Sequence, residues 1–112
     1  MSSTPSLRYI ESGDKLKDAV LQLQTLRLVG LDIETTGLEP FIDKITLIQL
    51  GTEEEVFIFH VEKCGAHIKE LAAIISNPAI SKIGQNLFFE WVFLEAYGIP
   101  LRGLLLDTMI PA

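Results

Sequence analysis

The chain has 112 residues, of which 48% are hydrophobic and 21% charged, and its formal net charge is −6. This length suits one small domain, and the balance is typical of a globular protein and excludes a disordered one. The acidic charge argues against nucleic-acid binding through a general basic coat, although it is equally ordinary for any soluble acidic protein.

The chain has a single cysteine, Cys64, which excludes an internal disulfide and a metal cluster built from cysteines. The N-terminal segment lacks the apolar core of a signal peptide, and the apolar runs are too short to span a membrane. We therefore expect a cytoplasmic protein with no membrane partner. We expect one domain over residues 1–112, with residues 1–6 disordered.

The first predicted elements are a short strand at residues 7–10 and a helix at residues 12–25. Ser12 stands where a serine caps the start of a helix. The apolar residues near helical spacing predict the buried face of this helix, which consists of Leu16, Val20, Leu21 and Leu23.

Three strands are predicted in succession, at residues 26–33, 44–50 and 55–61. The first is an apolar run, which is typical of a strand buried on both faces. The second alternates apolar and polar residues, and the third is rich in β-branched and aromatic residues. Short links between the three strands predict an antiparallel meander.

The rest of the chain alternates helix and strand. We expect a helix at 66–76, a strand at 80–83, a helix at 86–97, a strand at 104–106 and a helix start at Asp107 and Thr108. Pro78 ends the first of these helices and Gly98 the second. The predicted fold class is α/β, with an antiparallel three-strand meander and then parallel strands in one mixed sheet flanked by helices.

Two acids, Asp32 and Glu34, lie two residues apart at the end of an apolar strand. Because side chains alternate along a strand, both carboxylates point to one face, where they repel each other and lose solvation. A divalent cation such as Mg²⁺ or Mn²⁺ relieves both problems, since hard cations prefer oxygen ligands. Taken without the flanking sequence, the pair is better explained as two hydrated acids where the strand end turns into solvent.

A second polar pair, Asn86 and Glu90, lies four residues apart and so on one face of the predicted helix. Glu90 stands in an apolar run, and a buried acid needs a partner, which is either a metal ion or a lysine such as Lys82. Asn86 is also placed to cap the helix. Core packing is the expected role of the surrounding apolar residues, Phe88, Phe89, Trp91, Val92 and Phe93.

Other polar residues give weaker signals. Asp107 is a secondary candidate, because an Asp directly before a helix is usually a cap. Cys64 and His67 have Cys-x-x-His spacing, which is common by chance. The sequence contains neither a glycine-rich phosphate loop nor the surroundings of a nucleophilic serine.

Three segments taken together resemble a known family. LDIETTGLEP resembles the first motif of the DEDD (DnaQ-like, ribonuclease-H-like) 3′–5′ exonuclease superfamily, and KIGQNLFFEWVFL resembles the second. LLLDTMIPA resembles the segment that follows in the proofreading exonuclease domains of family A (DNA polymerase I-like) DNA polymerases. The resemblance covers roughly residues 28–112.

The resemblance implies a ribonuclease-H-like fold and a set of site residues. It implies that Asp32, Glu34 and Glu90 are catalytic acids that bind Mg²⁺ or Mn²⁺, with two ions in the complete family site. It implies that the 3′-terminal nucleotides of a single strand, preferably DNA, contact Thr35, Leu38 and Asn86.

The chain departs from the family pattern at two places. Glu90 stands where the family usually carries Asp, and the longer side chain would shift a bound metal ion. The third family motif, with a fourth acid and a water-orienting Tyr or His, does not occur within residues 1–112. We therefore expect a C-terminally truncated exonuclease domain that is weak or inactive alone and that a polymerase or another chain completes. The alternative is a non-catalytic remnant that binds nucleic acid or a protein partner.

Overall fold

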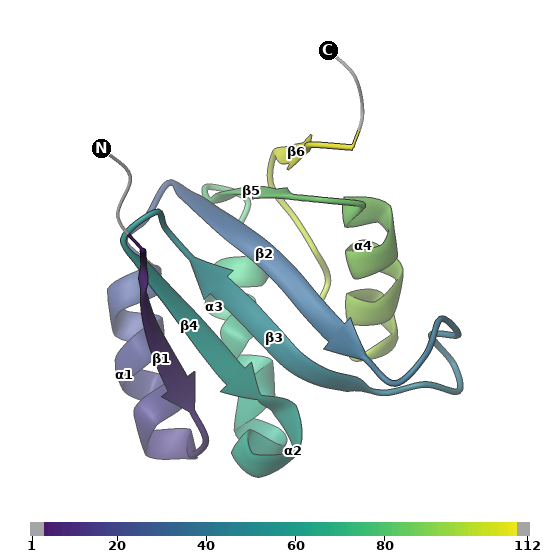
Figure 1. The fold of residues 1–112 in the computed structure, drawn as a ribbon. Helices are drawn as coiled ribbons and strands as arrows, with labels where there is room; N and C mark the ends of the chain where they lie inside the picture. The colour runs from purple at the N-terminus through teal and green to yellow at the C-terminus, as the bar shows by residue number, and fades with distance from the viewer. Residues whose placement is uncertain (1–3, 110–112) are drawn as a thin grey trace.

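A mixed sheet organises the computed structural model, which describes residues 4–109 (Figure 1). Its strands are β1 (Ser6–Ile10), β2 (Leu28–Thr35), β3 (Ile45–Gly51), β4 (Glu55–His60), β5 (Ser81–Gly84) and β6 (Leu105–Asp107). They lie in the order β1-β4-β3-β2-β5-β6. The pairs β2–β3 and β3–β4 are antiparallel, whereas β1–β4, β2–β5 and β5–β6 are parallel. The predicted meander followed by parallel strands is therefore confirmed.

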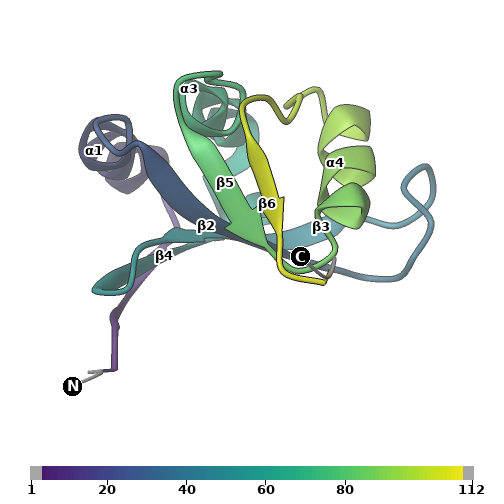
Figure 2. The ribbon, with the colours of Figure 1, turned by 90° about the horizontal axis from the view of Figure 1, so that it is seen from above.

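The helical segments lie against one face of this sheet. They are α1 (Gly13–Leu23), α2 (Val61–Cys64), the 3-10 helix η1 (Gly65–Leu71), α3 (Ala72–Ile75) and α4 (Leu87–Ala96). Figure 2 shows α1, α3 and α4 on the same side of the strands. Within residues 4–109, no helix has the length and apolar character needed to cross a membrane.

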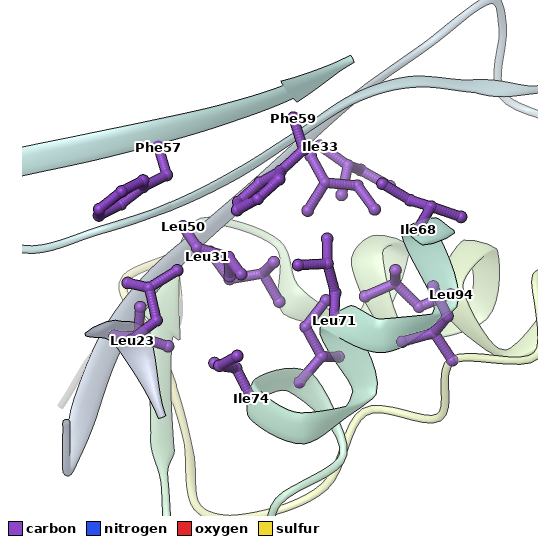
Figure 3. Close-up of a cluster of buried hydrophobic side chains, with 14 of the residues drawn as sticks. Leu23, Leu31, Ile33, Leu50, Phe57, Phe59, Ile68, Leu71, Ile74 and Leu94 are labelled. Atoms are coloured by element: carbon purple, nitrogen blue, oxygen red, sulfur yellow. The ribbon is translucent and has the colours of Figure 1, made fainter. Parts of the chain in front are cut away.

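The core lies between the sheet and these helices, and Figure 3 shows part of it. Burial alternates along β2. Val29, Leu31 and Ile33 are buried, whereas Asp32 and Glu34 are exposed. The prediction that this strand is buried on both faces is wrong, because helices cover only one face here. The buried side chains that meet those of β2 in the core come from other strands and from the helices, among them Leu23, Leu50, Phe59, Leu71, Ile74 and Leu94.

The first elements follow the sequence closely. Ser12 caps α1 by accepting a hydrogen bond from the Lys15 amide, with 3.3 Å between nitrogen and oxygen. Leu16 and Leu23 are buried as predicted, but Leu21 is 63% exposed and is not part of the apolar face. Ser6, within the segment predicted to be disordered, pairs with β4 in the sheet, and residues 1–3 lie outside the described residues.

The helix predicted at residues 66–76 is broken into η1 and α3. Gly65 is the first residue of η1 and has a φ of 59°, a left-handed conformation that ends α2 and that other residues rarely adopt. In contrast, α4 ends as predicted. Gly98 has a φ of 79°, and the Ile99 amide donates to the Leu94 carbonyl at 2.9 Å, which is a Schellman ending.

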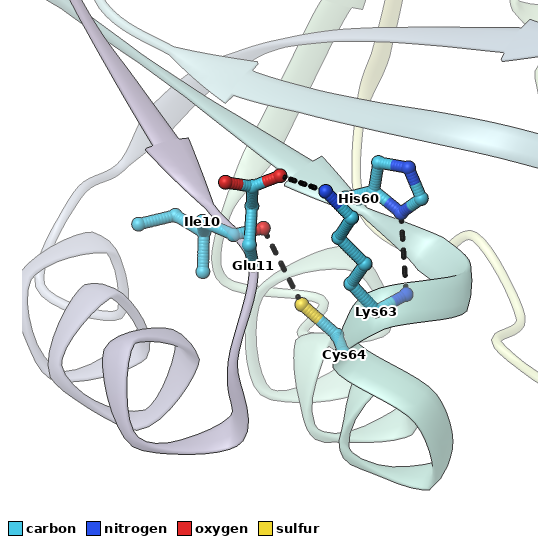
Figure 4. A network of polar contacts seen from close by, with 5 residues as sticks. All are labelled: Ile10, Glu11, His60, Lys63 and Cys64. Atoms are coloured by element: carbon cyan, nitrogen blue, oxygen red, sulfur yellow. Dashed lines mark hydrogen bonds and ion pairs between the residues drawn. The ribbon is translucent and has the colours of Figure 1, made fainter.

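Figure 4 shows polar contacts that join the end of β1 to α2. Lys63 pairs with Glu11, with Nζ and Oε2 2.7 Å apart, and the Lys63 amide donates to His60 Nδ1 at 3.2 Å. The Cys64 thiol is buried and donates to the Ile10 carbonyl at 3.5 Å. Burial also raises the pKa of Cys64, so its role here is structural.

Lys82 is a fully buried cation inside β5. Its Nζ donates to the carbonyl oxygens of Asn77, Ile80 and Arg102 at 2.8, 2.7 and 2.7 Å. These bonds fix the turn before β5 and the segment that leads to β6. Burial lowers the Lys82 pKa from 10.5 to about 8.

Replacing Lys82 with Met should lower the free energy of unfolding at pH 7 by about 1–3 kcal/mol, because the three carbonyls lose their donor. Between about pH 8 and 10.5, the unfolded chain holds a proton that the folded chain has released. Wild-type stability relative to Lys82→Met should therefore rise with pH across that window. Urea unfolding of both proteins checks this, and a constant difference would contradict the assignment.

Candidate metal centre and nucleic-acid site

The candidate site lies at the second half of β2. There β3 pairs with Gly30–Thr35, whereas β5 pairs only with Leu28–Gly30. The edge of β2 beyond Gly30 is thus free of β5, and α4, which follows β5, brings Glu90 to the backbone of Ile33 there. The sheet topology therefore places the carboxylate of an α4 residue beside the strand that carries Asp32 and Glu34.

Asp32 and Glu34 occupy the uncovered face of the sheet, as strand alternation predicts. Partial burial raises the pKa of Asp32, and the negative charge of Glu34 raises it further. A hydrogen bond from the backbone of Ile33 opposes these effects. The two carboxylates are thus close enough to repel each other, and a cation between them would stabilise both.

Glu90 is the buried acid of the site, with 3% of its surface exposed. Its pKa is raised to about 8, first by burial and next by the negative charge of Asp32, with smaller contributions from Glu34 and Asp107. Its Oε2 is buried without a hydrogen-bond partner. Lys82 does not serve as that partner, since its Nζ donates to three carbonyls, and that alternative is wrong.

The donor set fits a hard divalent cation, because three carboxylates share one region and one buried oxygen has no partner. Within residues 4–109, the side chains as they stand do not gather three or more His, Cys, Asp or Glu into a ready coordination cage. Sharing an ion therefore requires Asp32, Glu34 and Glu90 to turn toward it.

The loop after β2 holds the predicted substrate residues Thr35 and Leu38. The Thr35 hydroxyl donates to the Gly37 carbonyl at 2.6 Å, so it helps to shape the turn. Asp43 closes the loop by accepting from the Glu39 amide at 3.0 Å, and a Cβ at Gly37 would collide with its carboxylate. Leu38 is left 80% exposed, which leaves its apolar side chain free to meet a base.

Asn86, the third predicted substrate residue, stands at the N-cap position of α4 but does not cap the helix with its side chain. The cap comes from Asp107, which accepts from the amides of Asn86 and Leu87 at 3.0 and 2.8 Å. Sequence reasoning missed this role. Asp107 also accepts from the Met109 amide at 2.9 Å, and any helix that begins there lies outside the described residues.

The aromatic residues around Glu90 divide between core and surface. Phe93 is buried, whereas Phe88 and Trp91 are 67% and 40% exposed, so core packing is wrong for these two. Their rings meet edge to face, with centroids 5.8 Å apart. No periodic signal in the sequence marks this division, because α4 is apolar on nearly every side.

A hollow of about 900 Å³ runs along the uncovered sheet face and reaches the candidate site. Its lining includes Leu28, Gly30, Asp32, Gln49, Ile83 and Gln85. Asp32 therefore opens onto a surface depression, and Gln85, beside Asn86, borders the same depression.

Comparison with known proteins agrees with this geometry. A family model described as 3′-5′ exonuclease matches residues 7–112. DNA polymerase I of Aquifex aeolicus is 33% identical over 102 residues, which is 91% of this chain and 16% of the polymerase. The chain therefore spans only a small part of this relative.

Solved structures share the fold. RNase D of Trypanosoma brucei in complex with an RNA superposes with a TM-score of 0.79 and 26% identity, over 92% of this chain and 37% of that one. The catalytic core of RRP6 from the same organism has a TM-score of 0.82 and 21% identity, over 95% of this chain and 30% of that one. The fold is thus of the ribonuclease-H-like class, as predicted. The chain belongs to the 3′–5′ exonuclease family that the matched model describes.

Replacing Glu90 with Gln should stabilise the metal-free protein, because it removes a carboxyl group that is costly to ionise where it is buried. The folded chain holds the Glu90 proton up to about pH 8, whereas the unfolded chain releases it near pH 4.5. Wild-type stability from this group therefore falls as pH rises from 4.5 to 8 and is level above that.

Thermal unfolding in chelator should thus show a Glu90→Gln gain that grows over this window. Glu62→Gln, which changes an exposed acid on α2, is the matched control and should show no such trend. A gain that does not vary with pH would mean that Glu90 is already ionised in the folded protein.

Proposed function

We propose that this chain is a metal-dependent exonuclease domain that removes nucleotides from the 3′ end of a single strand. The proposal depends chiefly on Glu90, a buried carboxylate with one unpartnered oxygen, in electrostatic contact with Asp32 and Glu34. Such a group is stable in the folded chain only if it is protonated or meets a cation. Membership of the 3′–5′ exonuclease family supports the second of these.

Asp32, Glu34 and Glu90 would hold the divalent cations. When bound, such ions would supply activation of a water molecule and stabilisation of the charge that develops on the phosphate. The chain's own residues supply the binding of the strand end. Leu38 offers exposed apolar surface to a terminal base, and Asn86 lies exposed at the start of α4 for contact with the backbone.

We propose DNA as the preferred substrate. The support is the sequence likeness to DNA polymerase I of Aquifex aeolicus. The RNase D structure with a bound RNA is less similar in sequence, at 26% identity. Among the described residues that line the hollow beside Asp32 there is no Lys or Arg, and the charged ones are the acids Asp32, Glu53 and Glu54, so base contacts would contribute more to binding there than phosphate contacts.

A second candidate is a non-catalytic domain of the same fold that binds nucleic acid or a protein. Two observations favour it. The carboxylates are not gathered into a cage as they stand, and Glu90 is one methylene longer than the Asp usual at that position. In this case single strands would bind equally well with and without metal.

The chain should shorten a 5′-labelled single-stranded DNA from its 3′ end in Mg²⁺ or Mn²⁺, although slowly, and Asp32→Asn should abolish this. Loss of a carboxylate should also weaken Mn²⁺ binding by at least tenfold in calorimetry, since it removes one of few ligands. Asp18→Asn, on the exposed side of α1, is the matched control and should behave as wild type.

Equal Mn²⁺ affinity in wild type and Asp32→Asn would overturn the metal assignment. Strand binding without any shortening, unchanged by chelator, would instead support the non-catalytic candidate. A parallel assay with an RNA of the same sequence tests the preference for DNA.

A further inference from the structure

The start of α4 is built in an unusual way. Asn86, at its N-cap position, has a left-handed φ of 53°, and its side chain makes no capping hydrogen bond. The first amides of a helix have no partner within the helix, so another group must satisfy them. That group is the carboxylate of Asp107, 21 residues further along the chain, with Oδ1 on the Asn86 amide and Oδ2 on the Leu87 amide.

Asp107 is itself held firmly in place. It is the last residue of β6 and pairs with Gly84 at the end of β5. The Thr108 amide and hydroxyl both donate to the Gly84 carbonyl, at 2.8 and 3.2 Å. Gly84 lies so close to β2 that a Cβ there would stand 2.5 Å from the Leu31 carbonyl oxygen. The Asp107 carboxylate therefore has a fixed position relative to β2.

We propose that Asp107 is a positioning residue of the candidate exonuclease site, which orients Asn86 and Glu90 by capping α4 from β6. The proposal rests on the function proposed above. Glu90 is the fourth residue of α4, so it lies in the turn whose first amides Asp107 holds. The cap links the β5–β6 edge to the helix that carries Glu90, and so sets where that carboxylate stands beside β2.

The contacts of Asp107 distinguish this role from that of a metal ligand. Both of its carboxylate oxygens already accept backbone amides, from Asn86, Leu87 and Met109. Glu90, in contrast, has a buried oxygen with no partner. Asp107 thus acts on the site through the backbone of α4, whereas Glu90 faces the β2 acids directly.

Two substitutions separate the possibilities. Asp107→Ala removes all capping bonds, and we expect the kcat/KM for 3′-end removal to fall roughly tenfold or more, since small misplacement of reacting groups has effects of this size. Asp107→Asn keeps one acceptor oxygen, enough for the Asn86 and Met109 amides, but turns an NH2 donor toward the Leu87 amide, so its kcat/KM should lie between those of wild type and Asp107→Ala. A metal ligand would show the opposite, because a neutral amide is a poor ligand and Asn would be as harmful as Ala.

The chain supplies its own reporter of α4. Trp91 is the only tryptophan, directly follows Glu90, and contacts Phe88 in the first turn. In Asp107→Ala, acrylamide should quench Trp91 fluorescence more strongly, and the Leu87 amide should exchange with solvent at least tenfold faster. Asp107→Asn, which keeps part of the cap, should be quenched less strongly than Asp107→Ala. Far-UV circular dichroism establishes that each variant is folded.

The outcomes are distinct. Similar losses of activity in Ala and Asn, with Trp91 quenching unchanged in both, would overturn the positioning role. So would an Ala variant with wild-type activity and quenching. If Asp107→Ala does not fold, a loss of activity in Asp107→Asn together with stronger Trp91 quenching supports the proposal, and a loss of tenfold or more with unchanged quenching overturns it. If the wild type removes no nucleotides, the proposed function fails. The role of Asp107 is then tested without an activity assay, by comparing the Mn²⁺ affinity and the Trp91 quenching of wild type, Asp107→Ala and Asp107→Asn.

Discussion

The alternation of side chains along β2 is the constraint on which the rest of the structure depends. One face of this strand sends Val29, Leu31 and Ile33 into the core, and the other carries Asp32 and Glu34 toward solvent. A shift of one residue in its pairing with β3 would bury both acids and expose the core residues. The same hydrophobic contacts that fold the domain therefore also fix the orientation of the candidate metal ligands.

Glu90 lies on the helix α4 and not on a strand, and it is the acid of the site that is most costly to ionise. Its carboxyl group is buried beside two other acids, which is unfavourable unless a proton or a cation is present. The stability of the metal-free fold and the affinity for a cation are thus linked, because whatever relieves the repulsion stabilises the folded chain.

Much of this molecule is predictable from residues that are near one another in the chain. The spacing of Asp32 and Glu34, the short links of the meander and Gly98 at the end of α4 all act locally, and the structure has them as expected. The short helix α2, which ends at Gly65 with a positive φ, was not predicted, because four residues are too few to show a helical period.

The remaining differences depend on long-range contacts or on chemistry that periodicity does not report. The α4 cap comes from Asp107, which lies 21 residues away, and only the pairing of β5 with β6 brings the two together. In the sequence, Lys82 is a possible partner of an acid. In the structure it binds carbonyl oxygens instead, and these come from two separate turns. Phe88 and Trp91 are exposed on a helix whose sequence is apolar all round, so no stripe marks its outer side.

The position of β6 at the edge of the sheet has a mechanical consequence. Its outer backbone groups pair with no other strand in the described part of the chain, and Leu104, Leu105 and Leu106 are all exposed. Such an edge is a natural place for a further strand to add, whether from the same molecule or another. A strand added there would lie beside Asp107, so assembly at this edge would act on the orientation of α4 through the Asp107 carboxylate.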